Sequence, residues 1–248
     1  MFIHEYGNPE DETILLLHPM EITGQDLYEI FSEHLKGHYY IIAPDQGGHG
    51  GSSTYLSADQ EAESLKQALR KKGKTHIRLL YGASMGAAVG YRLMMDPSFT
   101  IDKIWFDGVA LHKNAWIADI GMRRMFLKKA RKLRKDPTQK ARHLIQSYGP
   151  RFGQIMKENF IKMSDTDIIH ICWACCHYDL TPLSEDLQNK IHLEYGQKDP
   201  DYLLSKKGLR TYWPKVKPVL RKGMGHCEYM AWHTKAYVEE IEEYIRGK

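Results

Sequence analysis

One short segment constrains the fold of this 248-residue chain more than any other. It is Gly82-Ala83-Ser84-Met85-Gly86, which follows the apolar run His76–Tyr81 and precedes the small-residue segment Ala87–Met95. The apolar run is typical of a buried strand, and the segment after the glycines is typical of a helix. A very tight turn leaves no room for side chains beside the serine, which explains glycine at both flanking positions. The pattern predicts a strand, a sharp turn with Ser84 at its tip, and a helix whose N-terminal N–H groups point at the serine.

Strand-like and helix-like segments alternate along most of the chain, which favours an α/β fold with a mostly parallel sheet. We expect strands at residues 2–6, 13–17, 39–43, 76–81, 103–111, 191–195 and 218–220. We expect helices at residues 24–35 and 57–71, directly after Ser84, and at 229–245. The predicted fold class is therefore α/β, with a central sheet of about seven strands flanked by helices.

The alternation stops between residues 113 and 182, where only helical patterns are visible. We therefore predict a core formed by 1–112 and 183–248, with 113–182 inserted as a helical cap or lid.

A basic amphipathic stretch at 122–142 lies within the predicted insertion. Its window 123–142 holds ten Lys or Arg and one acid, Asp136, although the whole chain has a net charge of only +4. We favour a cap helix that turns Met122, Phe126, Ala130 and Leu133 toward the site and its charges toward water. Attraction of anionic substrates, or contact with a membrane surface, is the less favoured alternative.

Composition narrows the class of protein. With 42% apolar and 27% charged residues, the chain is typical of a soluble globular domain. The N-terminus lacks the pattern of a signal peptide, and no apolar run approaches the ~20 residues of a membrane span. Three of the four cysteines cluster at Cys172, Cys175 and Cys176, which resembles neither a disulfide framework nor a zinc site with a second ligand pair. We expect a cytoplasmic protein without a metal or a nucleic-acid partner.

A serine hydroxyl becomes a nucleophile at neutral pH when a histidine takes its proton and a carboxylate orients that histidine. In an open parallel sheet, such groups come from loops at the carboxyl ends of strands. Asp199 follows the predicted strand at 191–195, and His226 lies in a glycine-flanked loop after the last predicted strand. The candidate catalytic residues are therefore Ser84, Asp199 and His226.

Each of these partners has an alternative explanation. Asp199 is also placed to cap a turn beside Pro200, and Asp201 and Asp107 compete for the role of the acid. His226 is one of 13 histidines, and an ordinary loop histidine is its alternative.

Three further stretches accompany the Ser84, Asp199, His226 order. Leu15–Met20 is similar to a strand that ends in His-Gly and leads into an oxyanion loop. Ala43–Ser52 is similar to a P-D-x-x-G-H-G-x-S segment. Gly196–Asp199 is similar to a G-x-x-D loop that carries the acid. On these motifs the chain resembles the α/β-hydrolase superfamily, in its capped group of esterase- and lipase-like serine hydrolases. The resemblance runs from residue 15 to residue 228, apart from the helical insertion.

The resemblance also implies an oxyanion hole made by the backbone N–H groups of Met85 and Met20. The chain departs from the family at Pro19, where glycine is usual. Proline has no N–H but is not the expected donor, and its fixed φ either rigidifies the loop or moves Met20 out of range. His18 and His49 are expected to hold their loops by hydrogen bonds.

Together these features predict a cofactor-free serine hydrolase that cleaves a small, partly apolar carboxylic ester through an acyl-enzyme. We expect activity to fall on acidification as His226 protonates, with an apparent pKa of about 6–7. The alternatives are a C–C bond hydrolase or lyase on the same fold, or a hydrolase-like ligand receptor with negligible turnover. Haloalkane dehalogenases and epoxide hydrolases are disfavoured because those branches place Asp where this chain has Ser84.

Overall fold

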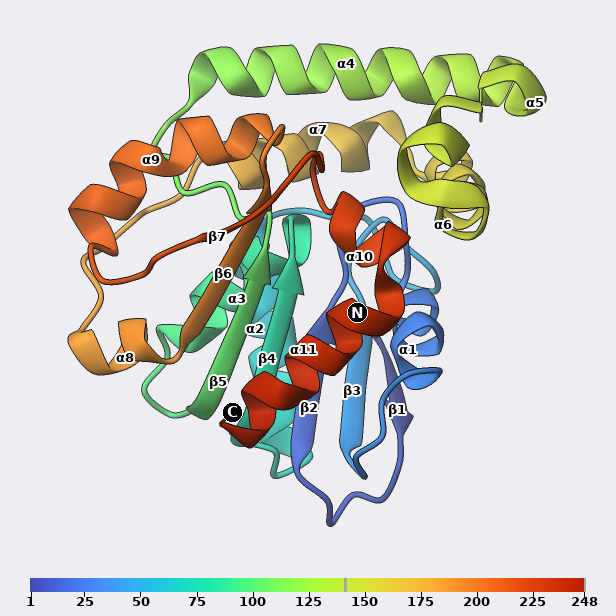
Figure 1. The fold of residues 1–248 in the computed structure, drawn as a ribbon. Coiled ribbons are helices and arrows are strands. Elements are labelled where there is room, and N and C mark those ends of the chain that lie inside the picture. Colours follow the sequence, from blue (N-terminus) through green and yellow to red (C-terminus); the bar gives the residue numbers. More distant parts are fainter. Residues whose placement is uncertain (141, 248) are drawn as a thin grey trace.

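The computed structural model describes residues 1–140 and 142–247. Seven strands form one sheet in the order β1-β3-β2-β4-β5-β6-β7 (Figure 1). β1 runs antiparallel to β3, and every other neighbouring pair is parallel. The strands are β1 (Phe2–Tyr6), β2 (Thr13–Leu17), β3 (Tyr40–Asp45), β4 (His76–Ala83), β5 (Thr100–Asp107), β6 (Ile191–Gly196) and β7 (Val219–Arg221). The predicted fold class, a mostly parallel sheet flanked by helices, is confirmed.

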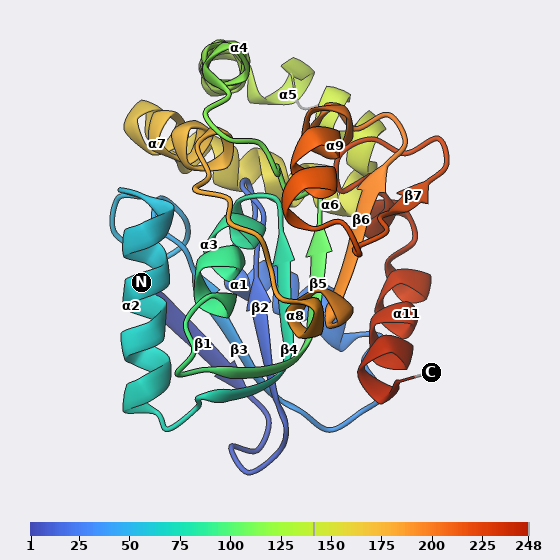
Figure 2. The same ribbon diagram turned by 90° about the vertical axis from the view of Figure 1, so that its left-hand side faces the viewer.

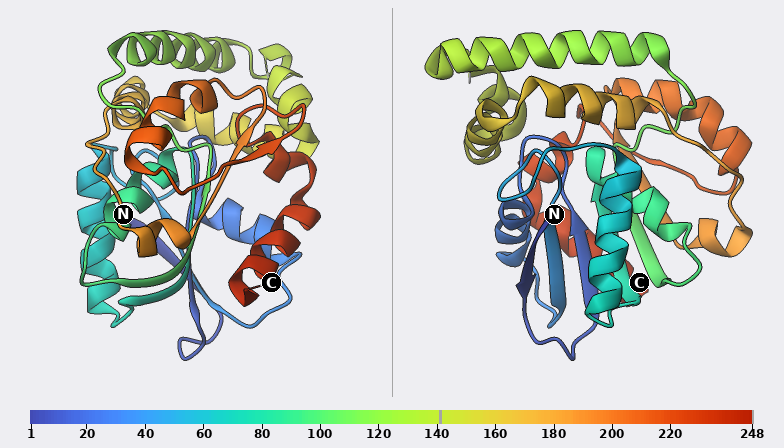
Figure 3. Two further views of the ribbon diagram at one scale, coloured as in Figure 1. Left: turned by 60° about the vertical axis from the view of Figure 1, so that its left-hand side comes forward. Right: turned by 180° about the vertical axis from the view of Figure 1, so that it is seen from behind.

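Helices cover both faces of the sheet. α2 and α3 lie on one face, and α1 and α11 lie on the other (Figures 2 and 3). These helices and two shorter ones are α1 (Gly24–Ser32), α2 (Ala58–Lys71), α3 (Met85–Met94), α8 (Glu185–Asn189), α10 (Glu228–Trp232) and α11 (Thr234–Arg246).

A further group of helices lies above the carboxyl ends of the parallel strands (Figure 1). They are α4 (Trp116–Lys135), α5 (Pro137–Lys140), α6 (Arg142–Lys162), α7 (Asp165–Cys176) and α9 (Pro200–Tyr212). α4 to α7 fall between β5 and β6 in the chain, and the described part of that stretch contains no strand. The division into a core and a cap at residues 113–182 stays a prediction. Within the two described ranges, no helix has the length and apolarity that crossing a bilayer requires.

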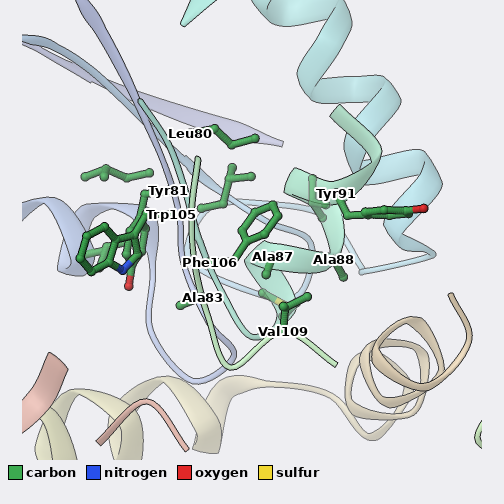
Figure 4. Close-up of a cluster of buried hydrophobic side chains, with 14 of the residues drawn as sticks. Leu80, Tyr81, Ala83, Ala87, Ala88, Tyr91, Trp105, Phe106 and Val109 are labelled. Carbon is green, nitrogen blue, oxygen red and sulfur yellow. The ribbon is translucent and has the colours of Figure 1, made fainter. Parts of the chain in front are cut away.

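The core lies between the sheet and its helices. All five residues of β2 are buried, as the continuous apolar sequence of a central strand predicts. Phe106 of β5 faces Ala87, Ala88 and Tyr91 of α3, whereas Trp105 projects from the opposite face of the sheet (Figure 4). A methyl group at Gly90 of α3 would lie 2.9 Å from the Phe106 ring, so α3 packs closely on the sheet. This packing fixes the helix that follows Ser84.

Several element boundaries differ from the sequence prediction. β5 ends at Asp107 rather than at residue 111, because Gly108 has a φ of +64° and turns the chain out of the sheet. The predicted last helix, 229–245, divides into α10 and α11 at His233, whose φ of −127° and ψ of 36° are not helical. β3 continues through Pro44, which pairs with Ile3 of the edge strand β1.

Candidate active site

Ser84 occupies a strained turn between β4 and α3. Its φ of 48° and ψ of −112° lie outside the regions that L-residues favour. A Cβ at Gly86 would lie 2.2 Å from the Leu17 carbonyl oxygen, and one at Gly82 would lie 2.9 Å from the Cα of Ala87. The flanking glycines are therefore required by backbone contacts, as the sequence pattern predicts. The Ser84 N–H donates to the Asp107 carbonyl oxygen at 2.8 Å, which ties the turn to β5.

Asp199 and His226 meet above the carboxyl ends of β6 and β7. His226 Nδ1 lies 2.8 Å from Asp199 Oδ2, and the aspartate side chain is completely buried. The second carboxylate oxygen of Asp199 accepts the N–H of Asp201 at 2.9 Å, where Asp199 caps the start of α9. Asp199 therefore has both roles considered from the sequence, the partner of a histidine and the cap of a turn. Its two hydrogen bonds fix the carboxylate relative to the imidazole.

The two competing acids are placed differently. Asp201 Oδ2 lies 3.6 Å from His226 Nδ1, beyond hydrogen-bond distance, and burial raises the pKa of Asp201 to about 6. Asp107 accepts the Tyr237 hydroxyl at 3.1 Å, and burial, followed by the nearby Glu194 carboxylate, raises its pKa well above the usual range. Of the three acids, Asp199 alone is hydrogen-bonded to His226.

The imidazole of His226 packs over Gly108. A methyl group there would lie 2.7 Å from His226 Cε1. Burial alone would lower the pKa of His226, but Cys227 and the Asp199 carboxylate outweigh it and hold that pKa well above its usual value. Burial raises the pKa of the Cys227 thiol to about 12, so that thiol is uncharged at neutral pH. The carboxylate is therefore the partner that retains a proton on the ring.

Ser84 and His226 line one cavity of about 800 Å³. Within the described residues, the Ser84 hydroxyl makes no side-chain hydrogen bond, so it is not hydrogen-bonded to His226. Hydrogen bonds of this kind often shorten only when substrate binds. The structure thus joins two of the three predicted residues directly and brings the third to the same cavity.

The two residues predicted to supply oxyanion donors belong to the same site. Met85 begins α3, Met20 lies in the loop after β2, and both line the cavity. In the described part of the chain, neither backbone N–H donates to another protein group. Both are therefore available to an oxygen bound beside Ser84.

Two buried histidines hold the loop that contains Met20. His18 Nδ1 lies 2.8 Å from the Pro19 carbonyl oxygen, and its Nε2 accepts the N–H of Gln46 at 2.9 Å. His49 Nε2 accepts the N–H of Glu21 at 3.2 Å. Burial lowers the pKa of both rings, which matches their acceptor roles. The loop is thus tied down on both sides of Met20, despite the departure at Pro19.

An ion pair between this loop and α4 was not predicted from the sequence. Lys129 Nζ lies 2.7 and 3.0 Å from the two carboxylate oxygens of Glu21, a buried residue with a φ of 76°. The same ammonium group lies 4.9 Å from the centre of the Phe160 ring. Nothing in the spacing of these residues could have signalled the pair, because they are 108 positions apart.

The cysteines and one group of acidic and histidine side chains are the candidates for redox chemistry or metal binding. All four cysteines are free and buried, and burial raises the pKa of Cys175 to about 12. Among the described residues, the one group of acidic and histidine side chains compact enough for a metal ion is Asp199, Asp201 and His226. A hydrogen bond already joins two of its members, which accounts for their proximity without an ion.

Comparison with known proteins places the fold. No protein-family model and no curated protein matches the chain. Solved structures match over nearly its whole length. An alpha/beta hydrolase family protein from Desulfitobacterium hafniense has 15% identity and a TM-score of 0.73, covering 97% of this chain and 98% of that one. An esterase from Exiguobacterium antarcticum has 14% identity and a TM-score of 0.71, and the match covers 98% of this chain and 94% of that one. A thermophilic esterase from Thermogutta terrifontis has 18% identity and a TM-score of 0.72, and the match covers 99% of this chain and 92% of that one. The chain therefore has the α/β-hydrolase fold, as its motifs predict.

Proposed function

We propose that the protein is a serine hydrolase that cleaves a carboxylic ester through an acyl-enzyme. The observation that carries the proposal is the 2.8 Å contact between His226 Nδ1 and Asp199, in a cavity that the strained Ser84 also lines. The esterases among the similar structures support hydrolytic chemistry. A weak nucleophile, a base and an orienting acid are the groups that acyl transfer needs.

The reaction can be followed from the atoms of the site. When the Nδ1–H group of His226 donates a hydrogen bond to the Asp199 carboxylate, Nε2 carries no proton and is the free base. Nε2 takes the Ser84 proton as Oγ attacks the ester carbonyl, and the N–H groups of Met85 and Met20 donate to the oxygen that becomes negative. The imidazolium then protonates the departing alcohol, which leaves the acyl group on Ser84. In the second half, Nε2 deprotonates a water that attacks the acyl-enzyme, and the carboxylic acid departs as Ser84 recovers its proton.

The lining of the cavity suits a partly apolar substrate. Its apolar wall includes Met20, Met85, Met122, Met125, Phe126, Leu133, Leu144 and Ile171. Ligand sites of this kind combine an apolar wall with a few polar groups that fix orientation. We propose that part of the ester lies against this wall.

The proposal is tested with p-nitrophenyl esters from acetate to palmitate and with a fluorophosphonate probe that labels activated serines. We expect hydrolysis of at least one ester, labelling at Ser84 by mass spectrometry, and loss of at least ~10³-fold in rate in Ser84→Ala. Ser147→Ala is the matched control, because Ser147 lines the same cavity and has no proposed role in the reaction. Full activity in Ser84→Ala, or labelling at another residue, would overturn the mechanism.

A further inference from the structure

We propose that the ester substrate carries an anionic group, which Lys128 and Lys132 bind on the α4 side of the cavity. This inference rests on the proposed hydrolysis at Ser84 and adds the substrate class. It starts from the position of the lysines, which both line the cavity that contains Ser84 and both belong to α4. That helix lies above the sheet (Figure 3).

Acidic and basic side chains both line the cavity, and most of its lysines belong to one helix. Its acidic residues, Asp199, Asp201 and Glu228, belong to the loops and helix ends around His226. Asp199 is hydrogen-bonded to that histidine, and Glu228 accepts the N–H of Gly225 at 2.7 Å. Three of the four lysines that line the cavity, Lys128, Lys129 and Lys132, are on α4, and the fourth, Lys198, directly precedes Asp199. An ester placed at Ser84 would therefore have acids beside its reacting end and cations on the α4 side of the cavity.

Four of the eight Lys and Arg residues of α4 form ion pairs among the described residues, and Lys128 and Lys132 are not among these four. Arg123 pairs with Asp119, Lys129 with Glu21, and Arg131 and Arg134 with Asp165. Within residues 1–140 and 142–247, Lys128 and Lys132 form no ion pair and no side-chain hydrogen bond. Their charges are therefore available to a ligand.

The spacing of the two lysines is suited to a single anion. Residues four apart lie on the same face of a helix, with Cβ atoms about 5–6 Å from one another, so two ammonium groups can converge on one carboxylate or phosphate. Like charges at this spacing destabilise the isolated helix, and a bound anion removes that repulsion. Met125 and Phe126 line the cavity nearby and provide apolar contact between the anion and the ester.

The test compares pairs of esters that differ by one anionic group. Mono-p-nitrophenyl adipate against p-nitrophenyl hexanoate places a carboxylate on the acyl part. 2-(Octanoyloxy)ethyl phosphate against 2-hydroxyethyl octanoate places a phosphate on the alcohol part. We expect the wild-type protein to prefer at least one anionic ester by about tenfold in kcat/KM, and about 0.5 M NaCl to reduce that preference. The pair that shows the preference identifies the part of the substrate that is charged.

The decisive variants lie on one helix. Lys128→Gln with Lys132→Gln is expected to abolish the charge preference. The matched control is Arg124→Gln with Lys135→Gln. All four residues border the outer groove of α4, but Arg124 and Lys135 do not line the cavity, so this variant should retain the preference. Equal rates for charged and neutral esters in the wild type, or equal loss in both double variants, would overturn the inference.

A binding assay separates failure of the anion site from failure of the proposed hydrolysis. Binding of the same four esters to Ser84→Ala protein, measured by calorimetry, requires no turnover. Tighter binding of an anionic ester, lost with Lys128→Gln and Lys132→Gln, supports the anion site even where no ester is hydrolysed. Equal binding of charged and neutral esters overturns it even where Ser84-dependent hydrolysis is observed.

Discussion

Replacing Lys129 by methionine tests the ion pair that joins α4 to the loop containing Met20. Methionine keeps most of the apolar stem and removes the charge, so the Glu21 carboxylate loses its partner. That carboxylate is 3% exposed, whereas the lysine side chain is 26% exposed. Breaking a fully buried pair costs about 3–5 kcal/mol, and partial exposure of the ammonium reduces this to about 2 kcal/mol. For a domain of this size, the melting temperature should fall by about 4–8 °C.

The effect of Lys129→Met should depend on pH in a defined direction. Burial raises the pKa of Glu21 and Lys129 lowers it, so removing the lysine raises this pKa further. A carboxyl group whose folded pKa lies above its unfolded value favours folding at low pH, and this contribution is lost as pH rises through the folded pKa. Relative to the wild type, Lys129→Met should therefore lose little stability at about pH 5 and the full amount at about pH 8.

The assay is urea unfolding at both pH values, followed by circular dichroism. Lys128→Met is the matched control, because it removes the neighbouring charge, which has no ion pair, and should cost less than about 0.5 kcal/mol. Adding Glu21→Gln to Lys129→Met should recover more than half of the lost stability, since no buried carboxylate is then left unpaired. A deficit that is the same at both pH values, or no recovery in the double variant, would refute the reasoning.

Three further outcomes follow from the geometry around Ser84. Gly86→Ala places a methyl group 2.2 Å from the Leu17 carbonyl oxygen, so its free energy of unfolding in urea should fall by about 3 kcal/mol. The control is Gly121→Ala, where the added methyl group meets no other atom and the free energy of unfolding should rise by about 0.5–1 kcal/mol. Ser84→Gly should be about 1 kcal/mol more stable than Ser84→Ala and melt at a higher temperature, because glycine accepts a φ of 48° without strain. Equal melting temperatures would mean that the turn stores no strain. The pKa of His226 is raised, and acylation needs the neutral ring, so ester hydrolysis should fall as pH decreases through a midpoint above the ordinary value of about 6.5; a midpoint at or below about 6 would contradict this.

Much of the fold could be predicted because the strands carry strong local signals. The run Thr13–Leu17 is apolar throughout, and β2 has the predicted bounds. Asp199 and His226 could be related from the sequence because the carboxyl ends of parallel strands meet at one edge. Their hydrogen bond agrees with that expectation, whereas their catalytic roles stay a prediction.

Other features depend on contacts that the sequence does not reveal. The sequence pattern ends the third strand before Pro44, whereas β3 continues to Asp45. Pairing of β3 with β2 stops at Ile42, so the missing N–H of Pro44 costs no hydrogen bond to β2. The Glu21–Lys129 pair joins segments with no shared pattern. The sequence suggests an ordinary histidine and a midpoint of about 6–7, whereas Cys227 and the buried Asp199 carboxylate, which raise the pKa of His226, lead us to expect a higher midpoint.

The pairing of β5 with β6 has a consequence for how activity is acquired. Ile104 pairs with Ile191, so this ladder closes a long loop that includes α4 to α7. Contacts between distant parts of a chain form slowly, because the entropy of loop closure is lost before the contacts compensate for it. Asp199 and His226 reach Ser84 only after this closure. During refolding from urea, helix content should therefore return before catalytic competence, and the lag should measure the docking of the last two strands.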